Sequence, residues 1–351
     1  MRSIILSLAS AIFVLAACAN SSEVSQPAAR PIVAQNELST AYIPSSEAGQ
    51  LAVDVREGEW TERRRLGSRT VPWKAYLPDA TAGAAPIVVW SHGLGGSRNG
   101  SESLGRHLAS HGIAAFHIQH PGTDTSAISE GGMASLMRDI RERPSLIVDR
   151  LRDVPFAVDE ITRMAESTLA DRIDASRIGM SGHSFGAITT LSAAGQRANN
   201  ALIGTRFAEP RFKAAFIMSP SPPRRGSAEA AFDNMLMPLF HLTGTEDASP
   251  IGDLEPAQRK IPYTVIDDVD QYLLEFNGGT HFTYTDTTTI RGRSLAYDGL
   301  ERHKDIMRAA ALAYWDGYLR DDPAALAWLR DGGLQSYAGD FAFVSFKPAS
   351  K

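Results

Sequence analysis

The pentapeptide Gly182-His-Ser-Phe-Gly186 constrains the fold of this chain more than any other feature. A short apolar run at 177–180 precedes it and an Ala- and Leu-rich stretch follows it, which predicts a strand, a tight turn and a helix. A serine at the tip of such a turn needs glycines two positions before and after it, because larger residues would clash with the neighbouring strand and helix. The pattern predicts that Ser184 is a nucleophile that projects above a β-sheet, with the positive end of the following helix directed at the developing negative charge.

Short apolar runs alternate with longer amphipathic runs along most of the chain. We expect strands at 86–90, 113–118, 177–180, 213–218, 238–242 and 272–276, and helices at 103–111, 146–165 and 305–319. The segment 71–76 is expected to add an antiparallel edge strand, and 122–144 and 221–237 are expected to be loops that bind substrate. This alternation predicts an α/β fold with a mostly parallel central sheet and helices on both faces.

A second glycine-rich turn, Ser91-His-Gly-Leu-Gly-Gly96, follows the predicted strand at 86–90. In hydrolases of this architecture, a backbone N–H from such a loop joins the N–H that follows the nucleophile to form an oxyanion hole. Leu94 and Phe185 are the expected donors. The alternative, a phosphate cradle, is disfavoured because the turn lacks both the lysine of a P-loop and the glycine spacing of a dinucleotide site.

The general base and its orienting acid are expected downstream, in the order serine, acid, histidine. Asp247 follows the predicted strand at 238–242 and is the preferred acid, with Glu246 and Asp253 as alternatives. His281 lies in a glycine-bearing loop after the strand at 272–276, and we expect it to take the Ser184 proton.

The other histidines have structural interpretations. His107 and His111 lie four residues apart on a predicted helix, a spacing that suits zinc. No third ligand is evident, and we expect no metal site. His183 is expected to support the turn, and His303 to lie at the surface. We expect His107 and His111 to pack against a helix or lie at the surface. Three more histidines are expected to be buried or near the site: His117, His120 and His241.

The N-terminus has the features of a secretory signal. A basic residue precedes an apolar stretch that is too short to span a bilayer, and Leu15-Ala-Ala-Cys18 is similar to a bacterial lipobox. Because Cys18 is the one cysteine in the chain, it is the predicted site of lipidation and the mature N-terminus. We expect the protein in the bacterial cell envelope, held by this lipid on the periplasmic side of the outer membrane.

The predicted organisation has three parts. Residues 1–17 form the signal peptide, 18–40 a lipidated flexible tether rich in Ser, Ala, Pro, Asn and Gln, and 41–351 a single catalytic domain. The formal net charge is −5, with no long run of one sign, so no basic face tracks phosphates and nucleic acid is not an expected partner.

Four motifs carry a resemblance to a known family. They are Ser91-His-Gly-Leu-Gly95, Leu108-Ala-Ser-His-Gly112, Gly182-His-Ser-Phe-Gly186 and Gly279-Thr-His281. With them the chain resembles α/β-hydrolases of the dienelactone-hydrolase-like and platelet-activating-factor-acetylhydrolase-like group over about residues 70–320. The resemblance implies an α/β-hydrolase fold and hydrolysis of carboxylic esters through an acyl-serine, with no metal or organic cofactor.

Two departures limit the resemblance. True dienelactone hydrolases use a cysteine nucleophile, whereas this chain has Ser184 there. The acetylhydrolase relatives place the acid after the preceding strand, where this chain has Met218-Ser-Pro220 and no carboxylate, and this directs the acid assignment to Asp247.

The main hypothesis is therefore a lipid-anchored serine esterase that acts on small or medium carboxylic esters. The alternatives are a phospholipid acyl hydrolase, a serine peptidase on the same fold and a non-catalytic lipid-anchored binding protein. Candidate substrate contacts are Met133, Leu136 and Met137 in one loop, Arg224 and Arg225 in another (for an acidic substrate), and Phe282 and Tyr284 beside the base.

Overall fold

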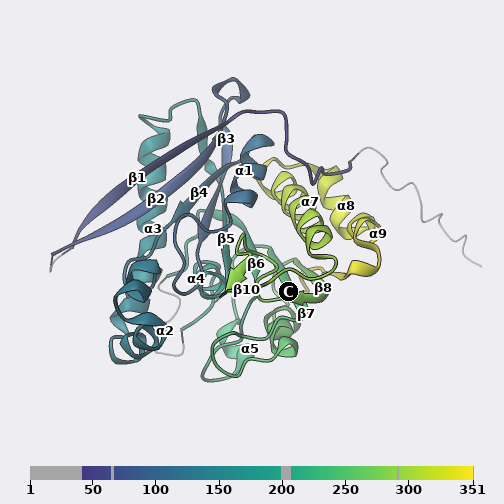
Figure 1. Ribbon diagram of the computed structural model, residues 1–351. Helices are drawn as coiled ribbons and strands as arrows, with labels where there is room; N and C mark the ends of the chain where they lie inside the picture. Colours follow the sequence, from purple (N-terminus) through teal and green to yellow (C-terminus); the bar gives the residue numbers. More distant parts are fainter. Residues whose placement is uncertain (1–41, 65–66, 199–206, 291, 351) are drawn as a thin grey trace, which may run out of the picture. The chain divides into compact units, whose positions relative to one another are not determined.

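The computed structural model describes residues 42–64, 67–198, 207–290 and 292–350 (Figure 1). All of these residues belong to one unit, Leu38–Lys351. The predicted signal peptide, Cys18 and the tether lie outside the described residues, so these predictions and the domain boundaries remain predictions. No helix within the described ranges is long and apolar enough to cross a membrane.

A nine-stranded sheet forms the centre of the described chain, in the order β1-β2-β4-β3-β5-β6-β7-β8-β11. The six strands from β4 to β8 run parallel, and β1, β2 and β11 are antiparallel to their neighbours. The segment 71–76 is antiparallel as predicted, but it is not at the edge, because β2 lies between β1 and β4. The strands are β1 Val53–Arg64, β2 Gly67–Pro78, β3 Ala85–Ser91, β4 Ala114–Ile118, β5 Ile173–His183, β6 Phe212–Met218, β7 Leu239–Glu246, β8 Gln271–Thr280 and β11 Ala342–Lys347; the short β9 Thr289–Ile290 and β10 Arg293–Ser294 pair separately.

Helices cover both faces of this sheet because its strands alternate their side chains between two apolar cores. On β3, Ile87 and Val89 belong to the core that includes residues of α3 and α4, whereas Val88 and Trp90 belong to the core that includes residues of α1 and α7. The helices are α1 Glu102–Ser110, α2 Thr125–Glu142, α3 Ser145–Ala165, α4 Phe185–Ala193, α5 Ala228–Ala231, α6 Ile261–Val265, α7 Leu300–Leu319, α8 Pro323–Arg330 and α9 Gly333–Ala338. The predicted α/β-hydrolase fold is confirmed.

The prediction that 122–144 is a loop was wrong, because most of it forms α2. Gly131 and Gly132 interrupt the helical pattern in the sequence, and Gly132 has a φ of 74° where the helix kinks. The kink lets one segment bend and remain helical on both sides.

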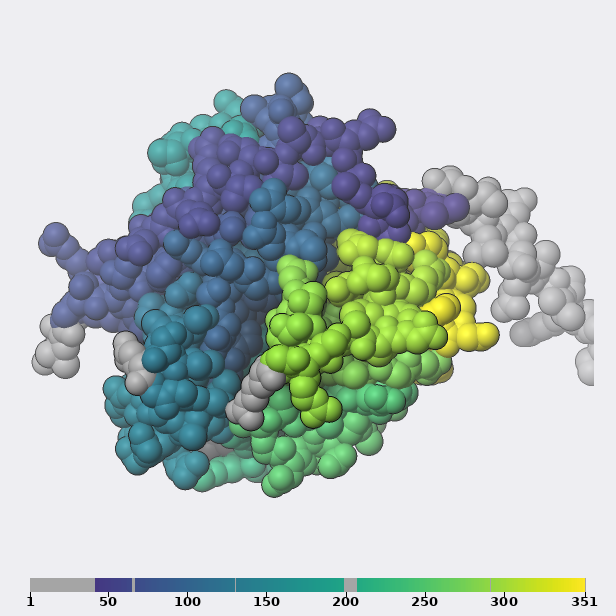
Figure 2. Space-filling model, in the orientation of Figure 1, coloured from purple at the N-terminus to yellow at the C-terminus, as the bar shows by residue number. Residues whose placement is uncertain are grey.

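The outer strands β1 and β11 were not predicted. Much of β1 is exposed, and its many charged residues hide the strand pattern. The hairpin β1–β2 follows one side of the molecule, and the chain that precedes it (also purple in Figure 2) reaches the C-terminal helices, where the Tyr42 hydroxyl donates to Asp316 of α7.

Candidate active site

Ser184 occupies the turn between β5 and α4, as the pentapeptide predicts. Its φ and ψ of 58° and −113° are strained for a residue with a side chain. A Cβ on Gly182 would overlap the carbonyl of Gly186, and one on Gly186 would overlap the carbonyl of Ser91. The two glycines are therefore required by the close approach of the turn, the helix and strand β3.

The structure brings Ser184, His281 and Asp247 together, although they lie far apart in the sequence. Ser184 Oγ lies 2.9 Å from His281 Nε2, and His281 Nδ1 lies 2.8 Å from Asp247 Oδ1. Because an ionised carboxylate only accepts, Nδ1 carries the proton and Nε2 is free to accept the serine proton. Asp247 and His281 are buried, and Ser184 is half-buried. This is the geometry that nucleophilic catalysis by serine requires.

The three candidates for the acid of the site differ clearly in their burial. Asp247 follows β7 and is fully buried, whereas Glu246 and Asp253 are exposed. Oδ2 of Asp247 accepts hydrogen bonds from Ser219 Oγ at 2.7 Å and Thr243 Oγ1 at 3.1 Å. Both carboxylate oxygens thus have partners, which fixes the orientation of the group beside the histidine.

Ser219 explains why this chain can do without a carboxylate at the end of β6. Its hydroxyl takes that place in the site and donates to Asp247 from the neighbouring strand end. Its φ of 56° turns the chain sharply after β6.

Arg259 is a buried residue of the site that sequence reasoning missed. Its Nε donates to the backbone oxygen of Asp247 at 3.0 Å, and its Nη2 lies 3.2 Å from His281 Nδ1. It also donates to the carbonyls of Ser219 and Pro220. Burial lowers the pKa of Arg259, and the nearby Asp247 charge opposes that shift. In the sequence, Arg259 looks like any surface cation, because its partners all come from distant segments.

The loop that carries the base is held from two sides. His183 Nε2 donates to the backbone oxygen of His281 at 2.9 Å, and burial lowers the pKa of His183 well below its usual range. His183 therefore supports the base as well as the turn. His303 was predicted at the surface, and this is wrong: it is buried and bonded through Nδ1 to Tyr297, which contacts Thr283 in the base loop. The helix α7 turns this histidine inward onto Phe276.

The predicted oxyanion donors lie beside the nucleophile. Leu94 and Phe185 line the same pocket as Ser184, and Phe185 is the first residue of α4. The loop around Leu94 is fixed by its neighbours: the Gly95 N–H donates to Thr123 O at 2.8 Å and the Gly96 N–H to Gly93 O at 3.0 Å. Among the described residues, the amides of Leu94 and Phe185 donate to no protein acceptor. Two N–H groups are thus available for a substrate oxygen.

The pocket in front of Ser184 has a volume of about 390 Å³. One part is apolar, with Met137, Ile140, Ile147, Leu151 and Ile188. Four arginines also line it, Arg197, Arg224, Arg225 and Arg259, and no carboxylate does among the described residues. Of the predicted substrate contacts, Met137, Arg224 and Arg225 line this pocket.

The other predicted contacts are placed elsewhere. Leu136 and Tyr284 are buried in packing contacts, and Met133 and Phe282 do not line the pocket as far as the structure describes it. Met133 and Met137 lie one turn apart on α2, beyond the kink at Gly132, and of the two only Met137 lines the described pocket.

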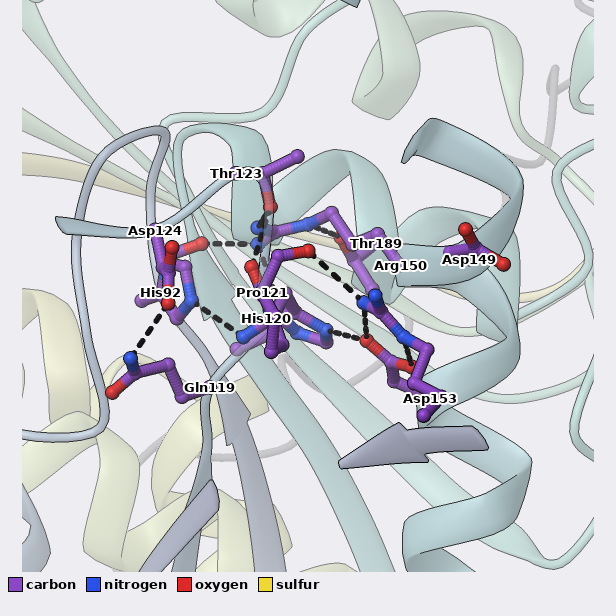
Figure 3. Close-up of polar contacts among 12 residues, drawn as sticks. His92, Gln119, His120, Pro121, Thr123, Asp124, Asp149, Arg150, Asp153 and Thr189 are labelled. Atoms are coloured by element: carbon purple, nitrogen blue, oxygen red, sulfur yellow. Dashed lines mark hydrogen bonds and ion pairs between the residues drawn. The ribbon is translucent and has the colours of Figure 1, made fainter. Parts of the chain in front are cut away.

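A second serine–histidine–aspartate chain lies behind the oxyanion loop (Figure 3). Ser91 Oγ lies 2.9 Å from His120 Nε2, and His120 Nδ1 lies 3.0 Å from Asp153 Oδ2. All three side chains are fully buried or nearly so. Ser91 Oγ also accepts from Arg150 Nη2 at 2.9 Å, so this serine has no free face toward a substrate.

Comparison with known proteins agrees with the fold. Residues 31–147 match the family model described as platelet-activating factor acetylhydrolase, isoform II. This stretch includes the loop around Leu94 but ends before Ser184, Asp247 and His281.

Curated relatives match longer stretches of the chain than the family model does. The chain is 23% identical over 273 residues to a platelet-activating factor acetylhydrolase of Bos taurus, covering 66% of this chain and 55% of that protein. With the Cavia porcellus protein of the same name it is 23% identical over 323 residues, covering 81% and 69%. With cutinase est1 of Thermobifida alba it is 28% identical over 204 residues, covering 58% and 54%. The chain spans about half the length of the first of these relatives.

Proposed function

We propose that this protein is a serine hydrolase that cleaves carboxylic esters through an acyl-serine intermediate. The observation that carries the proposal is the continuous hydrogen-bond chain from Ser184 through His281 to Asp247, with two unused backbone amides beside the serine. Similarity to proteins named acetylhydrolase and cutinase supports it.

The chain's own residues would perform each step. His281 Nε2 takes the proton as Ser184 Oγ attacks the ester carbonyl, and Asp247 stabilises the imidazolium that forms. The Leu94 and Phe185 amides hold the negative oxygen of the tetrahedral intermediate. His281 then gives its proton to the departing alcohol, and a water molecule repeats the sequence to release the acid.

The pocket supports an ester with an apolar part and an anionic group. Its aliphatic side chains suit a short or medium hydrocarbon chain, and its arginines would attract a carboxylate or phosphate on the same substrate. A phospholipid acyl hydrolase is the second candidate, favoured by the similarity to the acetylhydrolases, because a phospholipid combines both features.

The charge preference is testable with matched substrates. We expect the 4-nitrophenyl monoester of glutaric acid to have a lower KM than its methyl-capped neutral analogue, and the difference to shrink as salt is added. The double variant Arg224→Ser/Arg225→Ser should raise the KM of the anionic ester about tenfold and leave the neutral one nearly unchanged. Equal effects on both esters would contradict the preference.

We further propose that the mature protein is held at a bacterial membrane by a lipid on Cys18. The support is the sequence Leu15-Ala-Ala-Cys18 after a short apolar stretch. Wild-type cells fed a labelled fatty acid should incorporate it into the protein, and Cys18→Ala should abolish both the label and sedimentation with membranes. Membrane sedimentation of an unlabelled wild-type protein would contradict lipidation.

The main test of the function is a series of 4-nitrophenyl esters from acetate to dodecanoate. We expect turnover to peak at one chain length and to disappear in Ser184→Ala. No turnover on any ester, together with no fluorophosphonate labelling of Ser184, would overturn the proposal and favour a non-catalytic binding protein.

A further inference from the structure

Arg150 is a buried cation with no directly bonded carboxylate among the described residues. It lies on α3 and is 1% exposed, and no ion pair to it is found within the described residues. Its hydrogen-bond acceptors are all neutral (Figure 3): Nε donates to Thr189 Oγ1 at 2.8 Å, Nη1 to Thr123 Oγ1 at 3.0 Å, and Nη2 to Ser91 Oγ at 2.9 Å and to His92 O.

Such an arrangement opposes stability. Moving a charge out of water into a protein interior is costly unless an opposite charge compensates it directly. Burial lowers the pKa of Arg150 to about 9, although the more distant charges of Asp153 and Asp124 oppose that shift, and the guanidinium stays protonated at neutral pH. A cation in this place thus requires an account beyond the packing of α3.

The partners of Arg150 belong to both halves of the oxyanion hole. His92 opens the loop that carries Leu94, and its carbonyl accepts from the guanidinium. The guanidinium carbon lies 4.6 Å from the centre of the Phe185 ring. Thr189 lies one turn further along the helix that Phe185 begins. One planar cation therefore ties together the two segments whose amides face the substrate oxygen.

A buried relay fixes the direction of the Ser91 hydroxyl. Asp153 accepts two hydrogen bonds of 2.6 Å from Arg69, so its oxygens are acceptors and His120 Nδ1 must donate to it. Burial lowers the pKa of His120 well below its usual range and keeps the ring neutral. His120 Nε2 then accepts the Ser91 proton, and the serine's lone pairs are left for Arg150.

His120 also fixes the first residue of the oxyanion loop. Its backbone N–H donates to His92 Nε2 at 3.0 Å, so the His92 proton is on Nδ1 and donates to Gly93 O at 2.7 Å. Together with the bond from Arg150 to His92 O, this holds the peptide groups on the N-terminal side of Leu94 in one orientation.

We propose that Arg150 is a positioning residue for ester hydrolysis, holding the Leu94 and Phe185 amides in register and placing positive charge behind them. This inference rests on the proposed function. The charge matters most when the substrate oxygen becomes negative, so Arg150 stabilises the transition state more than the bound ester. Its loss should lower kcat and leave KM nearly unchanged.

The test compares two substitutions in the full chain with a matched control. Arg150→Gln removes the charge and keeps hydrogen-bonding capacity. Arg150→Lys keeps the charge and loses the planar guanidinium that donates to several acceptors at once. The control is Arg172→Gln, because Arg172 is also largely buried and donates to a backbone carbonyl, of Pro78, at the opposite end of β5. The readouts are kcat, KM, the melting temperature, and the affinity for a trifluoromethyl ketone, which forms a charged tetrahedral adduct, against that for its uncharged methyl ketone.

We expect Arg150→Gln to lower kcat about 100-fold and trifluoromethyl-ketone affinity in parallel, with KM and methyl-ketone affinity within about threefold of wild type. Arg150→Lys should recover about tenfold of the lost kcat, and Arg172→Gln should keep the wild-type kcat. A folded Arg150→Gln protein with kcat within threefold of wild type would overturn the proposal. A defect that appears only as a higher KM, with unchanged kcat, would also overturn it.

Two further experimental outcomes also distinguish the alternatives. If Arg150→Gln yields no folded protein, Arg150→Lys decides alone: a kcat about tenfold below wild type at unchanged KM supports the proposal, and a wild-type kcat overturns it. A wild-type protein that neither turns over esters nor reacts with a fluorophosphonate would defeat the proposed function itself. Active wild type with unaffected Arg150 variants would defeat only this inference.

Discussion

The described part of the chain contains two serine–histidine–aspartate chains with nearly the same hydrogen-bond lengths. In the first, Ser184 lies 2.9 Å from His281, which lies 2.8 Å from Asp247. In the second, Ser91 lies 2.9 Å from His120, and the histidine lies 3.0 Å from Asp153. By distance alone they cannot be told apart.

The surroundings of the two serines differ completely. Ser184 is at a strained turn, half-buried, and faces a pocket with two unused backbone amides. Ser91 ends a straight central strand, is fully buried, and already accepts a hydrogen bond from Arg150. The comparison predicts that only Ser184 reacts, because its hydroxyl is accessible and backbone amides can hold the negative oxygen of a tetrahedral intermediate.

Substitution of each serine in turn should produce the largest difference in kcat between the two chains. We expect Ser184→Ala to lower kcat at least about 10⁴-fold, because the covalent intermediate can no longer form. Ser91→Ala should keep at least about a tenth of the wild-type kcat, since it removes one of four hydrogen bonds to Arg150. Steady-state kinetics on the preferred ester would decide, and a larger loss in Ser91→Ala would contradict the assignment.

The two aspartates should separate activity from stability. Asp247→Asn is expected to lower kcat about 10⁴-fold, because an amide no longer enforces the histidine tautomer. Asp153→Asn should instead cost about 3–5 kcal/mol of unfolding free energy, since Arg69 loses its buried ionic partner, with kcat reduced no more than about tenfold. Chemical denaturation and kinetics on the same samples would test the pair; equal kinetic effects would contradict it.

The buried histidines should make stability depend on pH. Burial lowers the pKa of six imidazoles far below 6.5: His92, His107, His117, His120, His183 and His241. The unfolded chain then binds more protons than the folded one below about pH 6.5, so stability should fall as pH drops through 6.5, by up to about 1.4 kcal/mol per pH unit per histidine.

One imidazole can be removed to check the size of this effect. His241→Gln should make the slope of unfolding free energy between pH 5 and 6 shallower by about one proton. In NMR spectra of the wild type, the His120 ring should stay neutral from pH 8 to 5. A protonated His120 in the folded protein at pH 6 would contradict the tautomer assignment of the relay.

The smallest expected effect concerns the hydroxyl that replaces a carboxylate at the end of β6. Ser219→Ala should lower kcat about threefold to tenfold, because Thr243 still donates to the same oxygen of Asp247. Thr243→Val is the matched variant, with the longer of the two bonds, and should lose less. Loss of nearly all activity in Ser219→Ala would assign it a larger role than orientation of the acid.

The sequence predicted those parts of the site that local rules govern. Ser184 is marked by glycines on both sides within five residues, and Asp247 and His281 each follow an apolar strand at the sheet edge where such groups gather. The glycine pattern also pointed to Leu94 and Phe185, which the structure places beside the serine.

The remaining parts depend on contacts between distant segments. Arg150 meets Ser91 and Arg259 meets His281 across the fold, and an arginine on an amphipathic segment gives no sign of this in the sequence. Helix α2 was missed because its two adjacent glycines are typical of a loop, and the kink at Gly132 appears only in three dimensions. Burial of His303 likewise follows from how α7 packs on the sheet.

The most direct test of the central claim is to map where an active-serine reagent reacts. Wild-type protein treated with a fluorophosphonate and digested for mass spectrometry should carry one adduct per chain, on Ser184, and none on Ser91. The adduct should be absent from Ser184→Ala and present in Ser91→Ala. An adduct on any other serine, or no adduct on a folded wild-type protein, would contradict the assignment of Ser184 as the nucleophile.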